Sequence, residues 1–158
     1  MPIEDPWALP VAFYFHVEFQ HGPVEESIPF QSVAGLDMEL EVDTWYEGGA
    51  NEQAYHLPKG VKAGRLTLQR AVLPSETGKA GASLVEWVTK VINGDRSEPI
   101  ETSDVLVHLL DANGETLHLW RCHNAFPVKW STDKLDAQKN ELAISELVLA
   151  YSMIKQEK

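Results

Sequence analysis

Strict alternation of apolar and polar side chains near the N-terminus limits the fold of this chain more than any other feature. Over residues 13–20, Phe13, Phe15, Val17 and Phe19 alternate with Tyr14, His16, Glu18 and Gln20. Because successive side chains of a strand point to opposite faces, this pattern predicts a strand with one buried face.

The same period of two recurs in three later segments. One follows Ser32 and has Met38, Leu40 and Val42 on an apolar face, with Glu39, Glu41 and Asp43 opposite. A short segment around Leu66 and Leu68 repeats the pattern, and Glu141 to Tyr151 changes phase midway, which indicates a bulge or a strand buried on both faces.

An Asn113-Gly114 pair lies between two apolar runs, residues 105–110 and 117–122. This dipeptide favours the tight turn of a β-hairpin, so the two runs are predicted to pair antiparallel.

A single helix is predicted from Ser83 to Asn93. Ser83 and Glu86 have the spacing of a capping box, and Asn93-Gly94 is typical of a helix end. The apolar stripe is expected to pack the helix on the outer face of the sheet through four residues: Leu84, Trp87, Val88 and Val91.

At least six short strands, one helix and no alternation of strands and helices predict a mainly β fold, an antiparallel barrel or sandwich with a flanking helix. The 158 residues fit one domain, residues 1–158. No apolar run approaches the length of a membrane span, and the N-terminus lacks the pattern of a signal peptide, so we expect a soluble chain that folds in the cytoplasm without binding membranes.

Residues 46–62 show no regular pattern and contain Gly48, Gly49, Pro58 and Gly60. The segment is therefore predicted to be a long loop, and loops of this length are usually functional or disordered. We expect it to become ordered on contact with another subunit or ring, through eight stacking residues: Tyr46, Glu47, Gly48, Gly49, Asn51, Tyr55, His56 and Leu57.

Residue patterns for catalysis are missing, so the chain is not expected to be an enzyme or to hold a cofactor or metal. The Gly78-Lys79 pair lacks the glycine and hydroxyl of a phosphate loop. His118, Cys122 and His123 do not converge in a strand, and Asp111–Glu115 is too short for a calcium loop. A net charge of −11 also opposes stable nucleic-acid binding.

Taken in order, the segments resemble the tail-tube family of contractile phages and extracellular contractile injection systems. The resemblance covers nearly the whole chain and rests on "AGLD…YEGG", "LTLQR", "NAFPVKW" and "NELAISELVLAY" in combination. Two polar stretches depart from the family pattern, "LPSETGKAGAS" before the helix and "NGDRSEPIETSD" after it.

This resemblance implies a structural inner-tube subunit. Six copies would form a ring with a continuous inner β-barrel, and stacked rings would enclose a channel for a payload inside a sheath, between a baseplate with its spike and a cap. Such a chain would become part of a released or cell-associated injection particle or a virion. Because Glu39, Glu41 and Asp43 alternate with apolar residues, we expect them on the lumen wall or on an exposed sheet surface.

Three alternatives stay open. The chain could be the initiating ring paralogue beside the spike, a monomeric barrel that binds a small ligand, or an effector or enzyme on a related ring fold. The second requires an apolar pocket within one closed subunit, and the third requires a reactive cluster of side chains.

Overall fold

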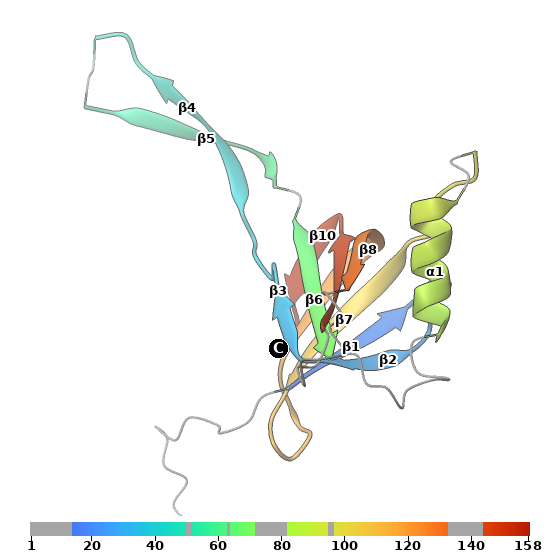
Figure 1. The fold of residues 1–158 in the computed structure, drawn as a ribbon. Helices are drawn as coiled ribbons and strands as arrows, with labels where there is room; N and C mark the ends of the chain where they lie inside the picture. Colours follow the sequence, from blue (N-terminus) through green and yellow to red (C-terminus); the bar gives the residue numbers. More distant parts are fainter. Residues whose placement is uncertain (1–13, 50–51, 63, 72–81, 95–96, 133–143) are drawn as a thin grey trace, which may run out of the picture.

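A computed structural model describes residues 14–49, 52–62, 64–71, 82–94, 97–132 and 144–158. These residues form one helix, α1 (Ala82–Asn93), and ten strands (Figure 1). The strands are β1 (Tyr14–Gln20), β2 (Ser27–Phe30), β3 (Ser32–Ala34), β4 (Leu40–Tyr46), β5 (Ala54–Val61), β6 (Arg65–Ala71), β7 (Ser103–Leu110), β8 (Thr116–Thr132), β9 (Ile144–Ala150) and β10 (Met153–Gln156).

Eight strands form an antiparallel sheet in the order β2-β1-β7-β8-β9-β6-β3, with β10 also paired to β8. The long strand β8 links two halves of the sheet, because its first half pairs with β7 and β10 and its second half pairs with β9. The sheet curls back on itself: β2 pairs with β1, and β3, which follows β2 after one residue, pairs with β6. The predicted mainly β, antiparallel fold with one helix is therefore confirmed, and of the two predicted forms, barrel or sandwich, the curled sheet is the barrel.

The barrel interior is filled by apolar side chains from both halves of the sheet. Val17 and Phe19 are buried, as the alternation in the first strand predicts. Leu147, Val148 and Leu149 are all buried, so β9 is buried on both faces. Further core residues come from the other strands: Ile28, Leu66, Leu68, Val105, Val107, Cys122 and Ile154.

Helix α1 lies beside the barrel and packs against β8 (Figure 1). Leu84, Trp87 and Val88 are buried in the same hydrophobic core as the strands, and Val91 is partly buried against it. The Trp87 ring meets Phe19 edge to face, with 6.1 Å between ring centroids. The predicted capping box is wrong, because the helix already includes Ala82, and the buried Ser83 hydroxyl has no hydrogen-bond partner in the described structure.

The hairpin between β7 and β8 has the predicted turn. Asp111 Oδ1 accepts hydrogen bonds from the amides of Asn113 at 2.8 Å and Glu115 at 2.9 Å. Gly114 has a φ of +84°, a backbone conformation that is unfavourable for residues with a Cβ atom. The Asn-Gly signal therefore located this turn correctly.

The prediction of an irregular loop over residues 46–62 is wrong. Ala54 to Val61 form β5, which pairs antiparallel with β4. Pro58 and Gly60 argued against a strand in the sequence, but a two-stranded ribbon has an open edge on each strand, where proline is tolerated. The two strands follow one another through a turn that includes Gly48 and Gly49.

The expected burial of the apolar side of residues 38–42 is also wrong within one subunit. Met38, Leu40 and Val42 are exposed, because β4 pairs with β5 and not with the barrel. Alternation reports a difference between two faces of a strand, and it does not show that either face packs inside the same chain.

Candidate assembly surface

Strands β4 and β5 form a two-stranded arm that projects away from the barrel (Figure 1). The arm continues the antiparallel pair β3 and β6, since β4 follows β3 and β5 precedes β6 along the chain. None of its residues belongs to the buried core of the described structure. The arm is therefore held by its own hydrogen bonds and by its base.

Seven large apolar side chains of the arm are between 49% and 73% exposed. They are Leu40, Val42, Trp45, Tyr46, Tyr55, Leu57 and Val61. Contiguous apolar surface of this kind marks protein–protein contacts or aggregation sites, because leaving it in water is unfavourable. The arm is therefore the candidate contact surface of this chain.

Strand register divides the arm into two faces. The charged face carries the cross-strand pairs Trp45 with Tyr55 and Asp43 with Leu57, followed by Glu41. The uncharged face carries the other pairs: Tyr46 with Ala54, Thr44 with His56, Val42 with Pro58 and Leu40 with Val61. Apolar side chains lie on both faces, so a partner on one side alone leaves half of them exposed.

Contacts at the base fix the direction of the arm. Gly35 has a φ of +88°, and a Cβ atom there would lie 1.9 Å from the carbonyl oxygen of Arg65. The Tyr151 hydroxyl donates a hydrogen bond to the Gly35 carbonyl at 3.0 Å. Lys62 pairs with Glu39 twice, through backbone atoms at 2.9 Å and through side chains at 3.1 Å. Glycine at position 35 is therefore required where the strands leave the barrel.

Most of the predicted stacking residues lie on this arm. Tyr46 ends β4, Glu47, Gly48 and Gly49 follow it, and Tyr55, His56 and Leu57 lie in β5. Asn51 is outside the described residues. Sequence reasoning missed that these residues form a paired ribbon, and it missed Tyr151 at the base.

The three predicted lumen carboxylates also belong to this region. Glu41 and Asp43 lie on the charged face of β4, and Glu39 just before it forms the ion pair with Lys62. All three are exposed. Glu41 and Asp43 therefore share the arm with the predicted stacking residues, and Glu39 lies at its base.

Neither a metal cluster nor a reactive thiol is seen among the residues that the structure describes. No three His, Cys, Asp or Glu side chains come together there as a metal site. Burial raises the pKa of the Cys122 thiol to about 12, so it stays protonated and unreactive at neutral pH. No helix among the described residues is long and apolar enough to cross a membrane.

Comparison with protein families matches residues 11–155 of the chain to the T4-like virus tail tube protein gp19 family. No curated protein sequence matches the chain.

Among solved structures, one similar chain comes from the sheath-tube complex of the PVC extracellular contractile injection system in its extended state. Its sequence is 27% identical to this one. The alignment covers 97% of this chain and 93% of that one, with a TM-score of 0.74. A chain from the cap of the anti-feeding prophage is 26% identical over 100% of this chain and 96% of that one, with a TM-score of 0.76. Hcp1 from Flavobacterium johnsoniae, 16% identical with a TM-score of 0.56 over 91% and 94% of the chains, shares the fold.

Proposed function

Because the chain belongs to the T4-like virus tail tube protein gp19 family, we propose that six copies form a ring around a channel and that these rings stack into a tube. The chain is a structural tube subunit of the kind found in contractile injection systems and phage tails. The observation that carries the proposed assembly is the arm, whose apolar side chains are exposed on both faces of a ribbon.

Six-fold symmetry has support from one relative. A chain of the anti-feeding prophage baseplate, described as 6-fold symmetrised, is 28% identical, and the alignment covers 94% of each chain with a TM-score of 0.72. Closed cyclic symmetry lets one head-to-tail contact repeat around a ring until no surface is left unpaired.

Open strand edges in the barrel favour such a head-to-tail contact. In the described structure β3 pairs only with β6, and residues 126–132 of β8 pair only with β9. Unpaired edges present backbone groups that a neighbouring strand can satisfy. The strands β3, β6, β9 and β8 can therefore continue from one copy to the next as a common inner barrel.

A polar cluster on β6, β8 and β9 is consistent with a hydrophilic patch on the channel wall. Gln69 donates a hydrogen bond to Glu146 at 2.9 Å, and Lys129 lies 3.5 Å from the same carboxylate. The Gln69 hydrogen bond lowers the pKa of Glu146, so this side chain stays ionised at neutral pH. Charges that are neutralised within the wall would adhere weakly to a moving payload. A lumen role for Glu39, Glu41 and Asp43 stays a prediction.

The proposed partners follow from the same relatives, which come from sheath-tube, baseplate and cap assemblies. We propose contacts with the corresponding sheath, baseplate and cap proteins, assembly in the cytoplasm, and a payload in the lumen. The baseplate relative favours one second candidate, an initiating ring beside the spike. A monomeric ligand-binding barrel has no such support, because apolar side chains fill the described interior.

Native mass spectrometry of the purified chain tests the ring. We expect a species with the mass of six 17.7-kDa chains, together with multiples of six where rings stack. Raising the salt concentration should not dissociate the ring if apolar arm contacts hold it, because salt screens charge pairs and not apolar burial. A chain that stays monomeric at every concentration contradicts the proposal.

A further inference from the structure

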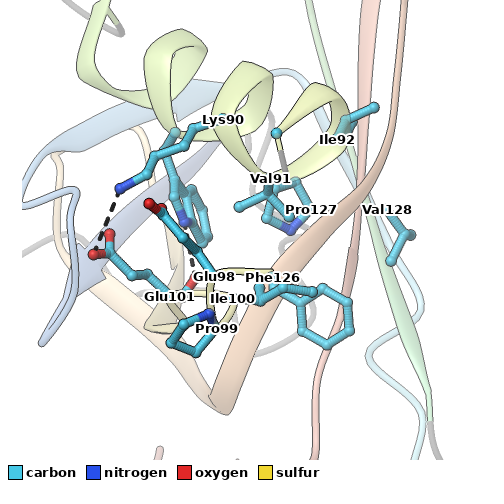
Figure 2. A pocket seen from close by; sticks show the side chains of 12 residues that line it. Lys90, Val91, Ile92, Glu98, Pro99, Ile100, Glu101, Phe126, Pro127 and Val128 are labelled. Carbon is cyan, nitrogen blue, oxygen red and sulfur yellow. Dashed lines mark hydrogen bonds and ion pairs between the residues drawn. The ribbon is translucent and has the colours of Figure 1, made fainter. Parts of the chain in front are cut away.

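A groove of about 390 Å³ lies between the end of α1, residues 98–101 and the middle of β8. Figure 2 shows Val91 from the helix beside Pro127, with Phe126, Ile100 and Pro99 below; Ile92 at the end of the helix also lines the groove. The Trp87 indole donates a hydrogen bond to the Glu101 carbonyl at 3.0 Å, which holds the 98–101 segment against the helix. The groove is therefore a formed feature of the barrel surface.

The groove has an apolar lining and an acidic rim. Ile92 is 40% exposed and Ile100 is 54% exposed, although both line a concave surface. Glu98 and Glu101 stand at the rim, where Lys90 lies 3.7 Å from the Glu101 carboxylate. The rim keeps an excess of negative charge beside the C-terminal end of α1, where the helix dipole is also negative.

Assembly from identical copies places a requirement on this surface. In a head-to-tail contact between identical copies, the arm of one copy is covered by a different surface of the next copy. Every chain must therefore carry that second surface as well as the arm. The arm leaves the barrel beside β3 and β6, and α1 lies on the opposite side (Figure 1). An apolar projection on one side and an apolar groove on the other are the arrangement that a repeating heterologous contact needs.

Charge decides which face of the arm fits the groove. The charged face carries the carboxylates of Glu41 and Asp43, which the acidic rim would repel; Lys59, at the register shift, belongs to none of the printed cross-strand pairs of either face. The uncharged face presents Leu40, Val42 and Val61 without any acidic group. We propose that the uncharged face of one copy's arm packs into the α1–β8 groove of a second copy, an inference that rests on the proposed tube function.

Substitutions in the groove test this contact without disturbing the core. Ile92→Glu and Ile100→Glu each place a carboxylate against the arm at a position that is already partly exposed. We expect each to lower the amount of sedimenting tube at least about tenfold, because one weakened contact repeats in every subunit. The matched control, Val85→Glu, adds the same charge to α1 at a side chain that is 49% exposed and does not line the groove. It should assemble like the unaltered chain.

Disulfide trapping tests the pairing directly and does not depend on a loss of assembly. Leu40→Cys, Val42→Cys and Val61→Cys are each combined with Ile100→Cys; Cys122 is buried and does not compete. Mild oxidation of assembled tubes should give covalent multimers for at least one pair, because a disulfide needs Cα atoms about 4.4–6.8 Å apart. Glu41→Cys and Asp43→Cys, on the charged face, should give none with Ile100→Cys.

The outcomes separate this inference from the tube function. Normal tubes from both groove variants, or intact tubes that yield no multimers with any uncharged-face cysteine, overturn the groove contact and leave the tube function standing. Multimers from the charged-face cysteines alone overturn the assignment of the face. Failure of the unaltered chain to assemble contradicts the tube function itself.

Discussion

Replacing Gly48 to Leu57 with a short Gly-Ser linker should leave a folded subunit that no longer forms long tubes. The change removes Ala54 to Leu57, the half of β5 that pairs with Asp43 to Tyr46 of β4. The barrel should survive, because the described hydrophobic core contains no arm residue. Assembly should fail, because every subunit loses Tyr55, Leu57 and the outer half of the ribbon at once, and only the base of the arm, with Leu40, Val42 and Val61, stays for a second copy to cover.

Circular dichroism measures whether the subunit is folded, and sedimentation velocity measures whether it assembles. The linker variant should keep the thermal transition of the barrel while sedimenting as small species. Gly48→Ser is the matched control, because a Cβ at Gly48 meets no atom within 4 Å and both strands stay intact. Tubes of normal length from the linker variant would show that the arm is not the assembly element.

Trp87→Ala should lower the free energy of unfolding by about 3–5 kcal/mol, the range for truncating a large buried aromatic side chain. Trp87 is 2% exposed, packs against Phe19, and donates a hydrogen bond to the Glu101 carbonyl. The substitution leaves a cavity between helix and barrel and removes the donor for that carbonyl.

Urea unfolding followed by circular dichroism measures the change. Val85→Ala is the control on the same helix, and its exposed side chain should change the unfolding free energy by less than about 0.5 kcal/mol. Equal stability of the Trp87 and Val85 variants would contradict the packing of α1 against the barrel. Because Trp87 supports the 98–101 segment, its loss should also weaken assembly at the groove.

Local sequence patterns were sufficient to predict the helix, strand and turn whose hydrogen bonds are made locally or within the sheet, and whose apolar face is buried within the subunit. The alternation before Gln20 identified β1, Asn113-Gly114 identified the β7–β8 turn, and the stripe through Trp87 identified α1. In each case the residues nearest in sequence determine the backbone, and the barrel core confirms the choice.

The arm could not be predicted in the same way, because its apolar side chains do not pack against any other part of the same chain. Val42 and Leu57 are apolar although both are exposed, and Pro58 and Gly60 argue against a strand by rules derived from central strands. Strand β2 was also missed, since Pro29 interrupts the short alternation of Ile28 and Phe30. Tyr151 at the arm base joins residues far apart in sequence, a contact that only the folded barrel creates.

Electron microscopy of the purified, unaltered chain tests the central claim most directly. We expect hollow rings with six-fold symmetry, stacked into tubes with an open channel. In a reconstruction, the arm of each copy should be covered on both faces by other copies. Particles with the dimensions of a single barrel, or rings in which the arms stay in solvent, would contradict the account.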